Sequence, residues 1–319
     1  MINKENDIPL YLEKLQALER RLTSTHPKYQ KVVDDYSRRM AGYKGEKSLD
    51  YYLSFLSKDK YTILHNLRIY NGEYYFQIDI LLITEKFILI IEVKNYSGVI
   101  HYDTNFNQLI RTQNGKEEAL PNPLAQIERQ KFQLITLLNK RNISYVPIET
   151  LAVISNPLTV IKSTTNHNNV SQKLLHSATL SKRIKELEQE YQELRLSRKE
   201  IRSLSKYLLK VNQPIEMNIL DRFNITNKDI LTGVQCPNCG IMPMERLHGR
   251  WSCKQCNHIS KDAHIKAIRD YRLLIGKDIT NQEARQFLNI SSIHTTKRLL
   301  TALNLRYTGS NKKRQYVLP

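Results

Sequence analysis

Residues 77–95 read QIDILLITEKFILIIEVKN, which is two apolar runs of strand length separated by a short polar turn. Such a pattern predicts a β-hairpin. With the turn centred on Glu85–Lys86, Asp79 lies opposite Glu92, and opposite residues of an antiparallel pair point to the same face. Lys94 shares that face with Glu92, because side chains alternate along a strand. The hairpin is therefore expected to gather two acids and one lysine.

These three charged groups suit phosphoryl chemistry assisted by a metal ion. Two adjacent carboxylates repel each other unless one is protonated or a cation bridges them. Oxygen ligands of this kind favour Mg²⁺ or Mn²⁺, and a neighbouring lysine can stabilise negative charge that develops on a phosphoryl group. The alternative is structural, with Lys94 forming an ion pair with Glu92 or Asp79 at the end of the sheet.

The sequence around the hairpin predicts an α/β fold. Apolar residues recur at helical spacing before the hairpin and again after Asn122-Pro123. Asn71-Gly72, between two apolar runs, indicates a second tight turn, and the continuously apolar run at 148–155 is typical of a buried strand. We expect helices over residues 9–41, 42–57 and 123–140, and strands over 61–70, 74–84, 87–96, 99–103 and 148–155.

Four short motifs occur in order within this region. They are G-Y-K-G-E, Q-I-D, E-V-K-N and N-P-L-A-Q, beginning at Gly42, Gln77, Glu92 and Asn122. The spacing D-x12-E-V-K resembles the PD-(D/E)xK nuclease pattern, and the four motifs together resemble the nuclease-related domain family, NERD. This resemblance implies a restriction-endonuclease-like α/β core over residues 38–160 and metal-dependent cleavage of phosphodiester bonds.

The resemblance also implies a role for each motif residue. Asp79 and Glu92 would hold Mg²⁺ or Mn²⁺, and Lys94 would be the catalytic lysine. Glu46 would be an additional acid that reaches the metal directly or through water, although an acid near a helix start is also favoured by the helix dipole. Gln126 would face the site from the first turn of the next helix; otherwise it is an exposed polar residue.

A second group of residues predicts a zinc centre. The cysteines of the chain form two C-x2-C pairs separated by thirteen residues, namely Cys236, Cys239, Cys253 and Cys256. Each pair can place two thiolates on one turn, and two pairs complete a tetrahedral site for structural Zn²⁺. We therefore expect a zinc ribbon over residues 233–259, with redox disulfides as the alternative. His248 and His258 could replace a thiolate, but four cysteines already complete the coordination.

Residues 260–319 predict a winged helix-turn-helix-like domain. Three helical stretches are followed by an alternating hairpin at 306–318, and Thr280 and Glu283 form a capping box at the start of the second helix. A winged helix would present its third helix to a DNA groove and its wing to phosphates. The alternative is a small helical domain that packs on the core or mediates dimerisation. The predicted DNA contacts are His294, Thr295, Lys297, Arg298, Lys312, Lys313 and Arg314.

The charge distribution favours a polyanionic partner. The net charge is +18, of which residues 1–160 carry +3 and residues 161–319 carry +15. Basic regions of this kind are typical of nucleic-acid-binding proteins, and the alternative is a charge that only maintains solubility. No apolar run reaches the length of a membrane span, and the N-terminus lacks a signal-peptide pattern. We therefore expect a cytoplasmic protein with DNA, and no membrane, as its partner.

These features predict a Mg²⁺-dependent endodeoxyribonuclease whose basic C-terminal module binds DNA. A homodimer would suit cleavage of both strands. One alternative is a non-catalytic nucleic-acid-binding or regulatory protein that keeps the nuclease fold as a scaffold, and another is an interaction protein that uses the zinc ribbon for protein contact. The predicted parts are a helical N-terminal extension (1–37), the nuclease core (38–160), a linker with one long amphipathic helix at 179–210 (161–232), the zinc ribbon (233–259) and the winged-helix-like domain (260–319).

Overall fold

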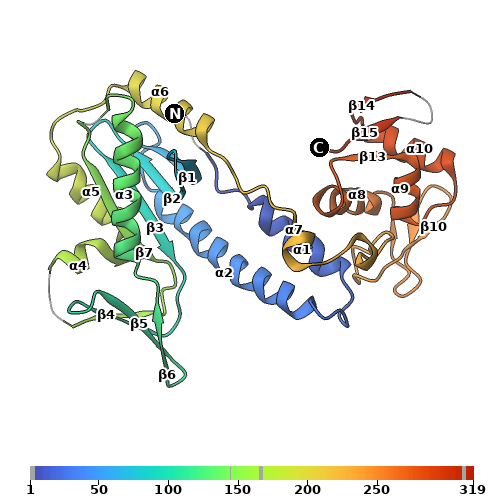
Figure 1. Ribbon diagram of the computed structural model, residues 1–319, viewed down its shortest axis with the longest axis horizontal. Coiled ribbons are helices and arrows are strands. Elements are labelled where there is room, and N and C mark those ends of the chain that lie inside the picture. The colour runs from blue at the N-terminus through green and yellow to red at the C-terminus, as the bar shows by residue number, and fades with distance from the viewer. Residues whose placement is uncertain (1–3, 144, 165–167, 311–313) are drawn as a thin grey trace. The chain divides into compact units, whose positions relative to one another are not determined.

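The computed structural model describes residues 4–143, 145–164, 168–310 and 314–319, and the chain divides into two compact units (Figure 1). Unit 1 comprises Met1–Asp7 and Met40–Pro214, and unit 2 comprises Ile8–Arg39 and Ile215–Pro319. Helix α2 (Tyr29–Leu53) begins in unit 2 and ends in unit 1. Within the described residues, no helix combines the length and the apolar character needed to cross a membrane.

Unit 1 is built on a mixed five-stranded sheet. In spatial order its strands are β1 (Thr62–Tyr70), β2 (Tyr75–Ile83), β3 (Ile88–Lys94), β7 (Ile148–Ile154) and β9 (Leu174–His176). The sheet is antiparallel from β1 to β3 and parallel from β3 to β9. The predicted hairpin register is confirmed, since Ile80 lies opposite Ile91 and Ile83 lies opposite Ile88.

Helices cover both faces of this sheet. They are α3 (Pro123–Asn139), α5 (Leu180–Glu190), α6 (Arg198–Val211) and the C-terminal part of α2. Leu134 of α3 and Leu204 of α6 belong to the apolar cluster on one face, and Leu49 of α2 and Ile184 of α5 belong to the cluster on the other. Because both faces are covered, the central strands are apolar at nearly every position. Burying one Ile or Leu contributes roughly 1.5–3 kcal/mol, so a buried acid in these strands requires a specific partner or function.

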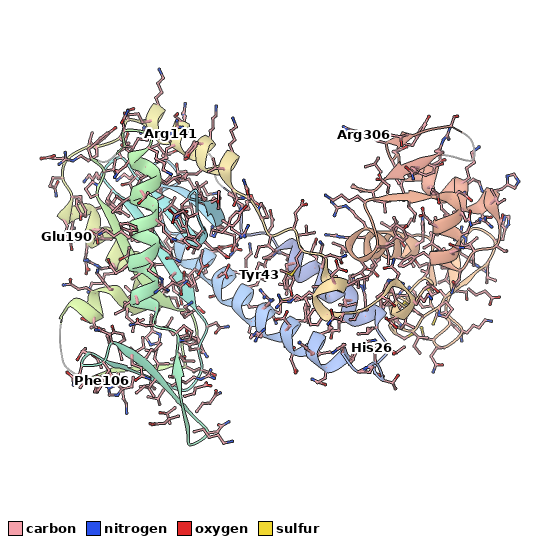
Figure 2. The ribbon with its side chains drawn as sticks, in the orientation of Figure 1. His26, Tyr43, Phe106, Arg141, Glu190 and Arg306 are labelled. Atoms are coloured by element: carbon pink, nitrogen blue, oxygen red, sulfur yellow. The ribbon has the colours of Figure 1, made fainter. Side chains whose placement is uncertain are left out.

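A second, four-stranded sheet in unit 1 was mostly missed by sequence reasoning. In spatial order its strands are β6 (Lys116–Leu120), β5 (Gln108–Gln113), β4 (Val99–Asp103) and β8 (Val160–Ser163), and only β4 is predicted. The turn between β5 and β6 is Asn114-Gly115, with positive φ at both residues, which is a usual hairpin signal. The polar, exposed strands around it concealed that signal. Figure 2 labels Phe106 at the β4–β5 turn, where its side chain is 80% exposed.

The helical predictions before the sheet need one correction. Residues 9–41 do not form a single helix: α1 (Leu10–Arg21) ends before Pro27, and α2 then continues through Gly42 to Leu53. The helix predicted to begin at Gly42 is therefore the second half of α2. Gly42 and Gly45 do not interrupt α2, because the packing of this helix against the sheet outweighs the weak helix propensity of glycine.

The helical predictions after the core also need correction. The single helix predicted over residues 179–210 is two helices, α5 and α6, and α6 begins at the capping box of Ser197 and Glu200. The two helices pack on opposite faces of the sheet, which one straight helix could not do. The predicted linker also contains α4 (Asn168–Lys173) and β9, which precede these two helices. Most of the predicted linker, up to Pro214, is thus part of unit 1.

Unit 2 combines the N-terminal helix with the C-terminal third of the chain. Arg21 of α1 is fully buried and donates to Asp270 at 2.7 Å and to two backbone carbonyls. Leu18 of α1 belongs to the same apolar cluster as Trp251. Residues 8–39 are therefore part of unit 2, in place of the separate extension that the sequence predicts.

In its described residues, the C-terminal part of unit 2 contains short strands, four α-helices and a 3-10 helix at Asn227–Asp229. Its elements are α7 (Ile219–Phe223), β10 (Glu245–Arg246), β11 (Trp251–Ser252), β12 (Ile259–Ser260), α8 (Ala263–Leu274), β13 (Asp278–Thr280), α9 (Asn281–Leu288), α10 (Ile293–Ala302), β14 (Tyr307–Thr308) and β15 (Gln315–Val317). The predicted capping box of Thr280 and Glu283 is confirmed, and Ser292 caps α10. Strands β14 and β15 pair as expected, and β13, which was not predicted, adds a third strand beside β15.

Candidate functional site

The two acids of the predicted hairpin are buried side chains of the central sheet of unit 1. Asp79 of β2 is 8% exposed and Glu92 of β3 is 3% exposed. Both lie next to the pair Ile80–Ile91 in the confirmed register. The backbone N–H of Val93 donates to Oδ2 of Asp79 at 2.9 Å, which fixes that carboxylate against β3. The sheet therefore places both acids together, as the sequence predicts.

Lys94 joins Glu92 to the next helix. Its Nζ donates to Oε1 of Glu92 at 2.7 Å and to Oε1 of Gln126 at 3.0 Å. Gln126 reaches this position because Asn122 caps α3 and accepts from the first backbone N–H groups of that helix. The structure thus brings together four of the five predicted site residues through direct contacts or adjacent register positions.

Gln130 is a site residue that sequence reasoning missed. Its Nε2 donates to Oε2 of Glu92 at 2.7 Å and to the carbonyl oxygen of Gln77 at 2.8 Å. The side chain is 4% exposed. The available signal was its position four residues after Gln126, because residues four apart share one face of a helix. Each oxygen of Glu92 therefore has its own hydrogen-bond donor.

Glu46 approaches this group from α2. Burial raises the pKa of Glu46 to about 7, and the charge of Glu92 adds to the rise against a hydrogen bond from Asn66. The close approach of α2 depends on Gly45, since a Cβ there would lie 2.7 Å from the Cβ of Asn95 and from Oγ of Ser155. Glycine is therefore needed at position 45, because a larger residue would push α2 away from the site.

The site contains more acid than its single lysine can balance. Burial, followed by the charges of Glu92 and Glu46, raises the pKa of Asp79 well above its ordinary value. Burial by itself lowers the pKa of Lys94, but the ion pair with Glu92 raises it above its ordinary value. A divalent cation would relieve this surplus of acid. The carboxylate oxygens also fit one, because each retains a second lone pair beside its hydrogen bond.

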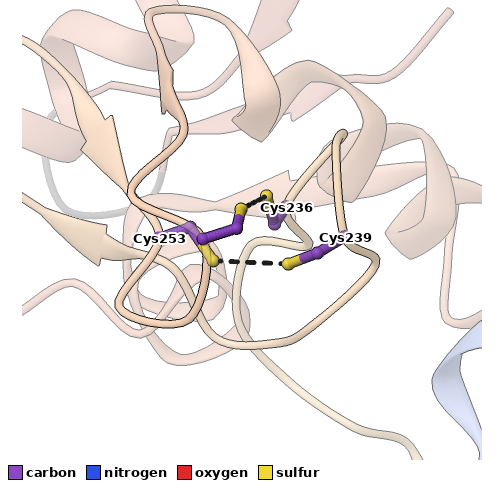
Figure 3. Close-up of side chains that lie close together, drawn as sticks. Cys236, Cys239 and Cys253 are labelled. Atoms are coloured by element: carbon purple, nitrogen blue, oxygen red, sulfur yellow. Dashed lines mark hydrogen bonds between the residues drawn. The ribbon is translucent and has the colours of Figure 1, made fainter.

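The four cysteines form a compact cluster in unit 2, and Figure 3 labels three of them, Cys236, Cys239 and Cys253. All four Sγ atoms lie within 4.8 Å of one another, with 3.6 Å between Cys236 and Cys256 and 3.5 Å between Cys239 and Cys253. Tetrahedral Zn²⁺ with Zn–S bonds of about 2.3 Å requires S···S separations of roughly 3.8 Å. The cysteines are free thiols, so the disulfide alternative does not describe this structure. The arrangement is consistent with the predicted zinc ribbon.

This cluster differs from the acidic site in unit 1. In the described parts of the chain, only the four cysteines place three or more His, Cys, Asp or Glu ligand atoms close enough to share one ion. His248 and His258 are not in the group. Asp79, Glu92 and Glu46 therefore do not form a preassembled cage, which suits Mg²⁺, an ion usually held by one or two carboxylates with water and phosphate.

The predicted DNA contacts are only partly described. His294, Lys297 and Arg298 are exposed on the first two turns of α10, and Thr295 is half-buried there. Lys312 and Lys313 lie outside the described residues. Arg314 is half-buried, and its guanidinium carbon lies 4.2 Å from the centre of the Tyr307 ring.

Unit 1 is therefore a mixed α/β domain in which two acids and a lysine gather on one central hairpin. Residues 41–155 match the family model NERD, the nuclease-related domain. This segment, about a third of the chain, is therefore a nuclease-related domain, and it includes every predicted catalytic residue from Glu46 to Gln126. No curated protein and no solved structure matches the chain.

Proposed function

We propose that unit 1 is a metal-dependent nuclease that hydrolyses phosphodiester bonds of DNA and that unit 2 binds the DNA. The observation that carries the proposal is the linked set of Asp79, Glu92, Lys94 and Gln126 in a nuclease-related domain. A core built only for stability would gain more from apolar residues at these buried positions.

Asp79 and Glu92 are the residues that would hold Mg²⁺ or Mn²⁺, with Glu46 near enough to contribute. When bound, such an ion polarises a phosphoryl oxygen and makes water a stronger nucleophile. The protein's own groups supply the rest. Lys94 is positioned to donate to a phosphoryl oxygen and to stabilise its developing charge. Gln126 orients the Lys94 ammonium group, and Gln130 fixes the carboxylate of Glu92.

The proposed reaction is the attack of water on phosphorus, with cleavage of the P–O3′ bond. The products are a 5′-phosphate and a 3′-hydroxyl, and the proton lost by water balances the one gained by the leaving oxygen. Glu46 suits proton exchange with water, because a group with a pKa of about 7 is efficient near neutral pH.

Unit 2 supplies the DNA-binding part of the proposal. Residues 236–319 contain 15 Lys and Arg against 5 Asp and Glu, and the order of helices and strands from α8 to β15 resembles a winged helix. Because both units belong to one chain, DNA held by unit 2 would have a raised effective concentration at unit 1.

A second candidate function is non-catalytic nucleic-acid binding. It is favoured by one observation: Lys94 and Gln130 already satisfy both oxygens of Glu92. A scaffold stabilised by this network would bind DNA without cutting it, and its affinity would not depend on Asp79.

The two functions separate in a nicking assay on supercoiled plasmid with Mg²⁺ or Mn²⁺. We expect nicking by the wild type and at least a hundredfold loss in Asp79→Ala and in Lys94→Ala. Asp59→Ala and Lys60→Ala are matched controls, since both residues are exposed in the loop before β1. Wild-type protein that binds DNA without nicking it would support the non-catalytic function. Nicking that persists in both site variants would show that the site has been misplaced.

A further inference from the structure

A cavity of about 730 Å³ lies in unit 2 between the β10–β11 hairpin and the start of α10. Its charged lining residues are Glu245, Arg246, Lys254 and Arg298. Glu245 forms an ion pair with Lys254 at 3.4 Å. Lys254 therefore neutralises Glu245, the single acid of the lining, and the two arginines give the cavity a net positive charge.

Arg246 is held in a defined orientation. It lies opposite Trp251 in the β10–β11 pair, and its guanidinium carbon is 5.0 Å from the centre of the Trp251 ring. Trp251 is itself fully buried, and its indole N–H donates to Nδ1 of His264 at 3.3 Å. An arginine packed on a fixed aromatic ring loses little further freedom when it binds a ligand.

The charge of Arg246 lacks a counter-charge. Its Nε and Nη1 are buried and find no hydrogen-bond acceptor among the described residues. Burial and then the charge of Arg298 lower the pKa of Arg246. Neither arginine forms an ion pair with a described acid. Two cations that face one cavity without an acid between them repel each other, and an anion in the cavity would remove that repulsion.

The start of α10 adds to the positive potential. Ser292 and Thr295 line the cavity, and Oγ of Ser292 accepts from the backbone N–H of Thr295 at 3.2 Å. The first N–H groups of a helix carry partial positive charge and commonly face phosphate. The helix end therefore adds to the positive potential in the cavity, most of which comes from the two arginines.

We infer that this cavity binds a phosphate group of a nucleic-acid backbone, with Arg246 and Arg298 as its cations. The inference rests on the DNA-binding part of the proposed function and gives it a specific site. The sequence analysis predicts Arg298 and Thr295 as DNA contacts, but not Arg246 of β10. The cavity would therefore join the predicted zinc ribbon and helix α10 into one phosphate-binding surface.

The test measures DNA affinity of the full chain by fluorescence anisotropy over a range of salt, without chelator, in an Asp79→Asn background. Each lost phosphate contact should reduce the salt slope by about one. We expect Arg246→Gln and Arg298→Gln each to weaken binding about tenfold with that change in slope. Lys261→Gln is the control, because Lys261 is exposed in unit 2 outside this cavity. Arg298 is exposed, so its variant stays informative if Arg246→Gln misfolds.

The outcomes separate this site from its alternatives. Equal weakening in all three variants, or unchanged binding in the two arginine variants, would overturn the inference. If the parent protein binds no DNA, but inorganic pyrophosphate raises its melting temperature and not that of Arg298→Gln, the cavity serves free phosphate and the nucleic-acid assignment is overturned. This test measures binding and not cleavage. A negative nicking assay therefore does not contradict the phosphate site, and a positive one does not support it.

Discussion

At the scale of single residues, Glu92 is the centre of the candidate site. Lys94 holds one of its oxygens and Gln130 holds the other, while Gln126 accepts a second hydrogen bond from Lys94. The carboxylate therefore cannot rotate without breaking charge-assisted hydrogen bonds, which are about twice as strong as neutral ones. Such preorganisation is what a site needs if its charges are to act in catalysis.

Glu46 should make the stability of unit 1 dependent on pH. Its pKa rises from 4.5 to about 7 on folding, mainly through burial. Between those values the folded protein retains a proton that the unfolded chain has released, so the stability contributed below pH 4.5 is lost as the pH rises through 7. We measure the free energy of unfolding with denaturant for Glu46→Gln and for the wild type. The value for the variant should rise by about 2–3 kcal/mol relative to that of the wild type between pH 4.5 and pH 8.

The control for this experiment is Ser57→Ala. Ser57 is exposed in the loop before β1 and has no titratable side chain, so the unfolding free energy of this variant should follow that of the wild type at every pH. Parallel curves for Glu46→Gln and wild type would mean that Glu46 is solvated and ionised in the folded protein.

At the scale of elements, the β10–β11 hairpin depends on the cysteine cluster. Cys236 and Cys253 are buried in the same apolar cluster as Met244 and Trp251. Strands of two residues cannot hold a hairpin by their own hydrogen bonds. A tetrahedral metal centre would supply the missing stability, as structural zinc does in small zinc-binding domains.

Removal of the metal should therefore expose Trp251. The chain has one tryptophan, and it is fully buried. We expect one zinc per chain by mass spectrometry, and a red shift of tryptophan emission when a strong chelator removes it. Cys239→Ser should reproduce the shift, whereas His248→Ala should keep both the zinc and the emission of the wild type. An unchanged emission maximum after complete loss of zinc would show that the hairpin folds without metal.

At the scale of the whole molecule, two segments that are far apart in the sequence pack into one unit. Residues 8–39 and 215–319 form unit 2 around one apolar cluster. Arg21 and Asp270 form its buried ion pair across 249 positions of sequence. Removing one partner of such a pair typically costs 3–5 kcal/mol, so the N-terminal helix is a structural part of the C-terminal module.

A core substitution in α1 tests this division of the chain. Leu18 is fully buried in the cluster that contains Trp251. We expect Leu18→Ala to destabilise unit 2 by about 3–5 kcal/mol, measured from the denaturant transition of Trp251 fluorescence. Ile8→Ala is the control, since Ile8 is 48% exposed. If residues 1–37 were an independent extension, Leu18→Ala would leave that transition unchanged.

Much of the candidate site was predictable because it depends on local pattern. The hairpin register follows from the length of its turn, and that register places Asp79 beside Glu92. The N-cap of Asn122 sets the start of α3 and the position of Gln126. The contact of Gln130 with Glu92 was not predictable from spacing alone, because it requires the distance between α3 and β3.

Sequence alone is enough to predict the central hairpin, the starts of α3, α9 and α10, and the two C-x2-C turns. All of these depend on neighbours within a few tens of residues, where strand alternation, helix capping and turn chemistry act. Long-range packing, in contrast, places α5 and α6 on opposite faces of the sheet and makes α1 part of unit 2. An apolar face on a helix predicts that the face will be buried. It does not predict which of several apolar surfaces will cover it, because the hydrophobic effect is not directional.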